Sequence, residues 1–166
     1  CVGWVLDTEC VMRGIVGEYL ISFERVGLKI VGTKMLQPGS EHYFEHYEGI
    51  GGLKTRKGEE IFETQLREMQ EGPVIAMVLE GVNAIEQVRK MVGETEPRSA
   101  APGTIRGDYA HMTYSHAAVT RRGTPNVVHA SAEPGEAEKE IAHWFKPEEL
   151  VTYDVAHAHF TQPKAA

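Results

Sequence analysis

The sequence predicts an α+β sandwich, in which helices cover one or both faces of an antiparallel sheet. Three observations support this fold class. Short apolar runs of strand length alternate with segments whose apolar residues recur at helical spacing, and this strand–helix order occurs four times. The run from Val74 to Leu79 is apolar throughout, which is typical of a central strand. The length of 166 residues suits one substantial core and one domain.

The N-terminal part is expected to form a strand, a helix and a second strand. Residues 2–6 are an apolar run, and a polar turn over residues 7–14 leads into a helical pattern over residues 15–26. Gly27 ends this helix, and residues 28–35 then read as a strand. Alternation along that strand places three residues on one face: Leu28, Ile30 and Gly32.

The middle of the chain continues the pattern. Ser40 is expected to cap a short helix over residues 41–44, and the glycine-rich, basic segment 49–58 is expected to be a flexible loop. A helix over residues 59–70 precedes the central strand. Asn83 is expected to cap a further helix, which Gly93 ends.

The last part combines two polar loops with a short strand and a helix. Residues 95–108 and 109–125 show no periodicity and are predicted to be loops, the second one long. Val127 and Val128 are expected to form the last strand, and residues 133–145 a helix. The chain is thereby divided into a domain over residues 1–152 and a C-terminal surface arm over residues 153–166.

Composition excludes several classes of protein. The net charge of -7 makes general attraction to nucleic acids or anionic membranes improbable. No apolar run reaches the length of a membrane span. The two cysteines, Cys1 and Cys10, give no disulfide framework, so a reducing, cytoplasmic location is expected.

Residues 95–140 contain the most informative combination of side chains. Arg98 and Arg106 lie on turn-rich backbone, His129 follows a short β-branched run, and Glu140 lies on the helix after it. A histidine beside a carboxylate is typical of a nucleophile or base with an orienting partner, and arginines suit phosphate oxygens. A histidine at the end of a strand is also commonly an ordinary packed residue, so this pattern alone leaves both interpretations open.

Seven segments, spread in order over nearly the whole chain, extend this observation. They are RGIVGE (13–18), FERVGLKI (23–30), GPVIAMVLEG (72–81), VRK (88–90), PGTIRGD (102–108), NVVHAS (126–131) and EAEKEI (136–141). Together they resemble the nucleoside diphosphate kinase family. The resemblance implies a ferredoxin-like topology and ping-pong transfer of the γ-phosphate from ATP to nucleoside diphosphates through a phosphohistidine. It also implies Mg²⁺ held mostly by phosphate oxygens and water, and a homo-oligomer, either a hexamer or a tetramer.

The resemblance also implies roles for individual residues. His129 matches the nucleophile, Glu140 the carboxylate that orients it, and Ser131 the hydroxyl beside the histidine. Tyr43 matches a tyrosine near the active site. The nucleotide-binding residues that it implies are Arg89, Thr95 and Arg106 for the phosphates, Asn126 for the sugar and Ile61, in the place of a stacking aromatic ring, for the base.

One departure from the family pattern concerns the phosphate site. Asp7 stands where the family has a lysine that touches the phosphates. An acid there removes an attraction and adds a repulsion, so a weak or inactive nucleotide-binding or scaffold homologue is the alternative to an active kinase. Arg121 and Arg122 are hypothesised to replace part of the missing charge.

A metal site has little support in the sequence. His42 and His46 are four residues apart, which places both on one face of a helix, as a metal-binding pair requires. A third ligand is not evident from the sequence, so no protein metal site is expected.

Overall fold

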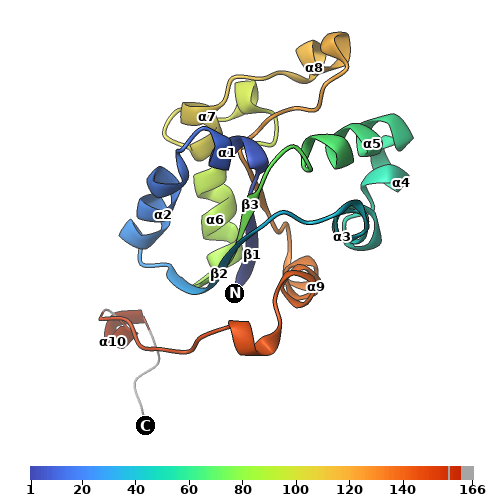
Figure 1. Cartoon of the computed structure of the whole chain (residues 1–166). Coiled ribbons are helices and arrows are strands. Elements are labelled where there is room, and N and C mark those ends of the chain that lie inside the picture. The colour runs from blue at the N-terminus through green and yellow to red at the C-terminus, as the bar shows by residue number, and fades with distance from the viewer. Residues whose placement is uncertain (157, 162–166) are drawn as a thin grey trace.

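The computed structural model describes residues 1–156 and 158–161, which form a four-stranded antiparallel sheet with helices on both faces (Figure 1). The strands are β1 (Val2–Leu6), β2 (Lys29–Leu36), β3 (Val74–Glu80) and β4 (Val128–Ala130). Their order across the sheet is β2-β3-β1-β4, and every neighbouring pair is antiparallel. This is the order expected of a ferredoxin-like fold, so the predicted fold class is confirmed.

Each face of the sheet has its own core, because successive side chains of a strand point to opposite sides. On one face, Trp4 and Leu6 of β1 pack with α2 (Val16–Arg25) and α6 (Ala84–Val92). On the other face, Val5 packs with α3 (Ser40–Phe44) and α9 (Pro134–Trp144). Figure 1 shows α2 and α6 on one side of the sheet and α9 on the other.

A bulge in β2 changes the face of one predicted residue. After Ile30 the register with β3 moves by one residue, which leaves Val31 as an extra residue in β2. A Cβ atom on Gly32 would lie 2.8 Å from the Leu150 side chain, in the core that α9 covers, whereas Leu28 and Ile30 pack in the opposite core. The prediction that Gly32 shares their face is therefore wrong, because a bulge interrupts the two-residue alternation.

The predicted glycine-rich loop is helical. It contains the end of η1 (Glu45–Ile50), a π-helix that continues α3, and α4 (Leu53–Lys57). The Glu48 carboxylate accepts a hydrogen bond of 2.6 Å from the backbone N–H of Lys54, which satisfies an amide at the N-terminus of α4. The prediction of a flexible loop over residues 49–58 is therefore wrong, since a side chain from the preceding turn caps a helix too short to show periodicity.

The two segments predicted as loops before β4 also contain short helices. They are η2 (Pro97–Ser99), α7 (Ile105–Tyr109) and α8 (Tyr114–Thr120). The Thr104 hydroxyl accepts a hydrogen bond from the Gly107 N–H at the start of α7, and Thr113 accepts one from His116 at the start of α8. These threonine caps were the local signal for both helices.

Two predicted caps differ in detail. Gly39, and not Ser40, occupies the N-cap position of α3. Asn83 is the N-cap of α6, but its side chain makes no capping hydrogen bond within the described structure; its backbone is left-handed, with φ of 49°. Asparagine tolerates this conformation better than most residues.

The remaining helices are α1 (Thr8–Met12), α5 (Glu59–Glu68), η3 (Pro147–Glu149) and α10 (Ala158–Thr161). Among the residues described, no helix has the length and apolar character needed to cross a membrane. The chain after η3 returns to the edge strand β2, where Val151 N–H donates to Val31 O (2.7 Å) and the Tyr153 hydroxyl donates to Ile30 O (2.8 Å). The predicted arm over 153–166 includes residues 157 and 162–166, which lie outside the described residues.

Candidate active site

A cavity of ≈ 710 Å³ opens beside the edge strand β4, where segments far apart in the sequence meet. Its walls come from η1, α4, α6, α7, β4 and α9. Five cationic side chains line it, although the whole chain is acidic: Arg56, Lys57, Arg89, Arg106 and Lys139. Cations gathered in this way suit an anionic ligand, and the planar guanidinium groups suit phosphate oxygens.

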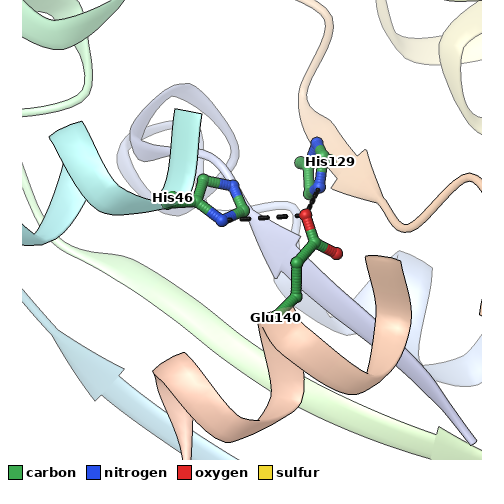
Figure 2. A group of neighbouring side chains, drawn as sticks. All are labelled: His46, His129 and Glu140. Atoms are coloured by element: carbon green, nitrogen blue, oxygen red, sulfur yellow. Dashed lines mark hydrogen bonds and ion pairs between the residues drawn. The ribbon is translucent and has the colours of Figure 1, made fainter. Parts of the chain in front are cut away.

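His129 and Glu140 form a hydrogen-bonded pair in this cavity (Figure 2). Because Val128 and Ala130 of β4 pack in the core beneath α6, His129 between them points to the opposite face, where α9 lies. Its Nε2 atom is 2.6 Å from Oε1 of Glu140, whose residue is 2% exposed. The other ring nitrogen, Nδ1, points away from Glu140. A buried carboxylate therefore orients the ring and holds the Nε2 proton, which leaves the lone pair on Nδ1.

The charges around His129 make its ring more basic. Burial by itself would lower the pKa of the imidazole, but the hydrogen bond and the charge of Glu140, together with Asp7 and Glu136, raise the pKa above its ordinary value. A more basic nitrogen is the better nucleophile once it is deprotonated.

Ser131 holds Glu140 in place and is itself fixed by the backbone of β1. The Ser131 hydroxyl is fully buried, 2.5 Å from Oε2 of Glu140 and 2.9 Å from the carbonyl oxygen of Gly3. A Cβ atom on Gly3 would lie 3.1 Å from that hydroxyl oxygen and 3.5 Å from Cβ of Glu140. Glycine at position 3 therefore allows β1 and α9 to approach closely enough for this arrangement.

His46 is a second histidine beside the pair. It comes from the π-helix η1, is 3% exposed, and its ring centroid lies 4.7 Å from that of His129. Trp144 donates its indole N–H to Nδ1 of His46 at 3.2 Å, so this nitrogen carries no proton. Burial, and then the neighbouring histidines, lower the pKa of His46 well below its ordinary value. The contact of 3.7 Å between His46 Nδ1 and Glu140 Oε1 is therefore not an ion pair, since His46 is neutral.

Arg106 joins two segments that lie far apart in the sequence, one at Gly93 and one at residues 126–128. Its guanidinium donates to the carbonyl oxygens of Asn126 (3.2 Å), Gly93 (3.0 Å) and Val128 (2.5 Å). Burial lowers the pKa of Arg106 to about 10, so it remains charged at neutral pH. Three of its five N–H groups are used in this way, which leaves two for a ligand in the cavity. The Asn126 amide donates to the carbonyl oxygen of Thr95 (3.1 Å), which fixes the neighbouring loop.

Asp7 lies in the same cavity, directly after β1. Its Oδ1 atom is buried and has no hydrogen-bond partner among the described residues. Burial raises the pKa of this carboxyl to about 6, against the opposing effects of His129 and Arg106. At pH 7 the group is therefore mostly ionised, and its negative charge faces the cations that line the cavity.

The structure brings most, but not all, of the predicted site residues to the cavity. His129, Glu140, Arg106, Arg89, Thr95 and Asn126 line it, and Ser131 contacts Glu140 from behind. Tyr43 is fully buried and stacks on Tyr47, which does line the cavity. Ile61 is 53% exposed and lies outside the lining, whereas Ile50 supplies an apolar wall.

Several lining residues were not singled out from the sequence. Arg56 and Lys57 come from the helical segment that the sequence predicts to be a flexible loop, and Tyr47 comes from the part of η1 that precedes it. The basic composition of residues 54–57 was the only local signal for the role of Arg56 and Lys57. Arg122 lines a separate, neighbouring cavity between α1 and α5, and Arg121 lines neither, so the structure does not place this pair beside His129.

A ferredoxin-like sheet with an oriented histidine facing a pocket of arginines defines a class of protein, the histidine-based phosphotransfer proteins. The family model described as nucleoside diphosphate kinase matches residues 4–150. The chain belongs to the nucleoside diphosphate kinase family, whose members are phosphotransferases. The family resemblance is thereby confirmed, and the inactive alternative is not favoured.

Individual relatives agree with this assignment. The nucleoside diphosphate kinase of Pyrococcus furiosus is 42% identical over 160 residues, which are 96% of this chain and 91% of the relative. Nucleoside diphosphate kinase B of Homo sapiens is 42% identical over 148 residues, with 89% and 87% of the two chains covered. One similar solved structure is a transition-state mimic of the enzyme from Borrelia burgdorferi, with bound vanadate and ADP. Its TM-score is 0.92 and its sequence identity 35%, and the comparison covers 96% of this chain and 95% of that chain. An enzyme from Halobacterium salinarum in complex with CDP has a TM-score of 0.82 and 34% identity, with 96% and 95% covered.

Proposed function

We propose that this chain transfers the γ-phosphate of ATP to nucleoside diphosphates by a ping-pong reaction through phospho-His129. The observation that carries the proposal is the 2.6 Å hydrogen bond between His129 Nε2 and Glu140, which leaves Nδ1 pointing away from the carboxylate in a cavity lined by arginines. Complexes of related enzymes with ADP and vanadate or with CDP support a nucleotide as the ligand.

In the first half-reaction, Nδ1 of His129 attacks the γ-phosphorus of ATP. The N–P bond forms as the bond between the γ-phosphorus and the β–γ bridging oxygen breaks, and ADP leaves with that electron pair. Glu140 holds the Nε2 proton and stabilises the positive charge that the ring gains. In the second half-reaction, a terminal phosphate oxygen of another nucleoside diphosphate attacks the same phosphorus, the N–P bond breaks, and the free histidine returns.

Cationic side chains would supply most of the catalysis. Phosphoryl transfer depends on positioning and on stabilising negative charge that is spread over the transferred group. Arg89 and the two remaining N–H groups of Arg106 would contact phosphate oxygens. Thr95 would assist them, Asn126 would contact the sugar, and Arg56 and Lys57 would add charge from the opposite wall.

Mg²⁺ is the cofactor that we propose, and it would arrive on the nucleotide. Mg²⁺ binds oxygen donors and keeps several waters, whereas Arg56, Arg89 and Arg106 in the cavity lining offer only N–H groups. This donor set fits an ion that is coordinated by phosphate oxygens and water. When bound, the ion neutralises part of the phosphate charge.

The setting of the reaction is also part of the proposal. We propose a cytoplasmic protein that assembles as a hexamer or tetramer, with residues 1–152 as the catalytic domain and 153–166 as its surface arm. Two free cysteines are consistent with a reducing compartment. Sedimentation velocity would measure the oligomer size directly.

The test of the function is covalent labelling. Incubation with γ-labelled ATP and Mg²⁺ should leave acid-labile, base-stable phosphate on the protein, and an unlabelled nucleoside diphosphate should remove it as labelled triphosphate. His129→Ala should abolish labelling, because the attacking nitrogen is lost. Glu140→Gln should slow it, because the amide cannot stabilise the charged ring.

The matched control is His143→Gln, which removes a histidine of α9 outside the cavity lining. It should be labelled like the wild-type protein. Label that persists in His129→Ala would remove His129 as the nucleophile, and stable label that no diphosphate can discharge would contradict the ping-pong reaction.

A further inference from the structure

We propose that His46, His129 and Glu140 form a binding site for a borderline transition-metal ion such as Zn²⁺ or Co²⁺, and that an ion bound there blocks phosphoryl transfer. This ion is distinct from the Mg²⁺ that accompanies the nucleotide. The blocking effect rests on the proposed function, because His129 and Glu140 also act in it, whereas the metal site itself does not.

The geometry provides three ligand atoms around one point (Figure 2). His129 Nε2 lies 2.6 Å and His46 Nδ1 lies 3.7 Å from the same oxygen, Oε1 of Glu140. One ligand atom from each of the three residues lies within 4.8 Å of the other two. Zinc binds nitrogen and oxygen at about 2.0–2.2 Å, so small side-chain movements would bring all three atoms into its coordination sphere. Over residues 1–156 and 158–161, this is the only group of three such side chains with that spacing.

The three ligand residues are fixed by the surrounding structure, and two of them are buried. The three ligands come from η1, β4 and α9, so separate elements fix them. His46 and Glu140 are 3% and 2% exposed, and the Ser131 hydroxyl at 2.5 Å from Oε2 orients the carboxylate. The side chain of His129 is 29% exposed and lines the cavity, so an ion can enter from that side and keep a water as its fourth ligand.

The protonation state of His46 favours the binding of a metal cation. A metal ligand must present an unprotonated nitrogen, and Nδ1 of His46 is unprotonated because it accepts the Trp144 indole N–H. This nitrogen and the Glu140 oxygen are two acceptors that face each other in a buried place, with no proton between them. An ion placed between them turns this unfavourable contact into two attractive ones. Nδ1 has a single lone pair, so the Trp144 indole must give up this hydrogen bond when the ion binds, which limits the affinity.

Two histidine nitrogens and one carboxylate oxygen select against Mg²⁺. Imidazole suits Zn²⁺ and Co²⁺, whereas Mg²⁺ prefers an all-oxygen shell with several waters. The metal would occupy Nε2 of His129 and displace its proton from the hydrogen bond with Glu140. It would also draw electron density from the ring, so that Nδ1 becomes a poor nucleophile. Ion binding and phosphorylation of His129 would therefore exclude each other.

Co²⁺ is the probe for this site, because its visible absorption reports a low coordination number with nitrogen ligands. Nucleotide-free wild-type protein titrated with Co²⁺ should develop saturable bands, which Zn²⁺ removes and excess Mg²⁺ does not. His46→Gln and Glu140→Gln should each weaken binding at least about tenfold. The matched control is His42→Gln, four residues earlier on α3, which η1 continues; it should bind like the wild-type protein.

Wild-type protein gives a second measurement that does not depend on the folding of any variant. X-ray absorption of the Zn²⁺ complex should show two imidazoles and oxygen ligands. Sulfur among the ligands would assign the ion to Cys1 or Cys10 and overturn the proposal. Absent cobalt bands, or bands that survive His46→Gln, would overturn it as well.

The two proposals fail separately. Labelling by ATP with Mg²⁺ is measured without transition metal, and cobalt binding is measured without nucleotide. Cobalt bands without any labelling would retain the metal site and reject the kinase function. Labelling that remains unchanged under saturating Zn²⁺ would reject the blocking effect.

Discussion

At the scale of single residues, the most unusual feature of the site is the negative charge of Asp7. Its carboxylate lies in the cavity near His129 and Arg106, and its buried Oδ1 has no partner among the residues described. A triphosphate brings several negative charges to the same place. We therefore expect Asp7 to oppose both the substrate and the transition state, while the cations on α4 and α6 attract them.

Replacing Asp7 by lysine should increase kcat/KM. The repulsion is lost, and a point charge that can reach a phosphate oxygen is gained. One effective interaction of ~2 kcal/mol would raise kcat/KM more than about tenfold. Asp7→Asn removes only the repulsion and should lie between the two. Steady-state kinetics at fixed Mg²⁺ and ionic strength would measure all three proteins, because salt screens exposed charges. Equal kcat/KM values would mean that Asp7 does not act on the phosphates.

At the scale of elements, short helices place the important side chains. The π-helix η1 carries both His46 and Tyr47 into the site, and wide helical turns of this kind are frequent at functional positions. The one-turn helix α7 positions Arg106, which joins the loops before and after it through three backbone carbonyls. Arg106 is therefore a structural tie as well as a proposed phosphate ligand.

Arg106→Lys should destabilise the fold as well as weaken nucleotide binding. A lysine ammonium cannot satisfy three carbonyl oxygens that the guanidinium holds in a fixed fork, and buried acceptors would lose their donors. We expect the free energy of unfolding to fall by about 2–4 kcal/mol, measured by urea denaturation. The exposed Arg89 is the control, since Arg89→Lys should change stability by less than about 0.5 kcal/mol. An Arg106→Lys midpoint equal to that of the wild-type protein would contradict the structural role.

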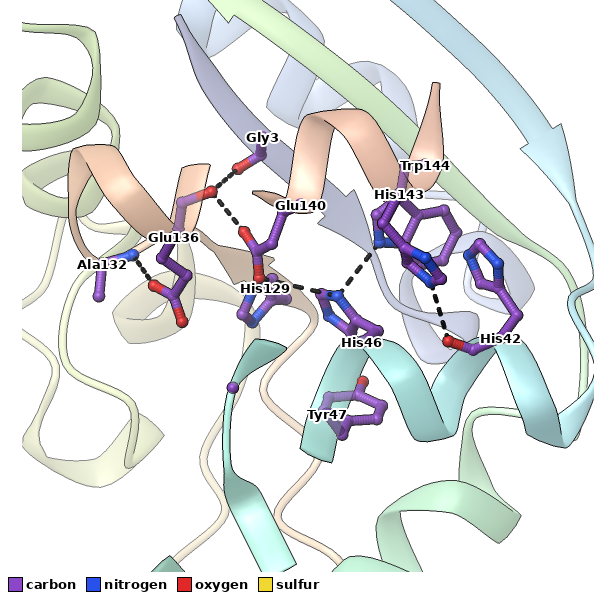
Figure 3. A network of polar contacts seen from close by, with 12 residues as sticks. Gly3, His42, His46, Tyr47, His129, Ala132, Glu136, Glu140, His143 and Trp144 are labelled. Atoms are coloured by element: carbon purple, nitrogen blue, oxygen red, sulfur yellow. Dashed lines mark hydrogen bonds and ion pairs between the residues drawn. The ribbon is translucent and has the colours of Figure 1, made fainter. Parts of the chain in front are cut away.

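At the scale of the whole molecule, packed histidines link the stability of the fold to pH. His42 stacks on His143 with 3.9 Å between ring centroids, and both rings pack against Trp144 where α3 meets α9 (Figure 3). Burial, and then the charges of His143 and Lys34, lower the pKa of His42 to about 4. Between pH 6.5 and pH 4, His42 therefore binds a proton in the unfolded chain but stays neutral in the folded chain, because its pKa is near 6.5 in the first and about 4 in the second.

Stability should consequently fall as the pH falls from about 6.5 toward 4. In this window the unfolded state binds more protons, so the free energy of unfolding increases with pH. His42→Phe keeps the stacked ring and removes the titration, and it should reduce the loss between pH 7 and pH 5 by about 1–2 kcal/mol. Thermal unfolding at several pH values measures this. His116→Gln, on exposed α8, should keep the wild-type dependence. A dependence that is identical in His42→Phe would place the acid-sensitive group elsewhere.

Local patterns in the sequence were sufficient for the sheet and for most of the site. Apolar runs and two-residue alternation located all four strands, although the last one spans Val128–Ala130 and not residues 127–128. Apolar spacing located α2, α5, α6 and α9, because the side of a helix that packs on a sheet carries apolar residues at regular spacing. The motifs around Arg106, His129 and Glu140 placed these three residues in one site before their distances were known. Motifs achieve this because they combine residue type with fixed spacing.

Tertiary structure decided the features that depend on contacts between distant segments. A capping carboxylate turned the glycine-rich stretch into helix, and this placed Arg56 and Lys57 in the cavity wall. The sequence around His46 could not show which ligands accompany this histidine in the proposed metal site. Those ligands, His129 and Glu140, come from a strand and from another helix. Short helices bury too few side chains to leave a period, and a cavity exists only where separate elements meet. For this reason the sequence alone determined the strands, the longer helices and the catalytic motif, while the packing of these elements decided which side chains face one another.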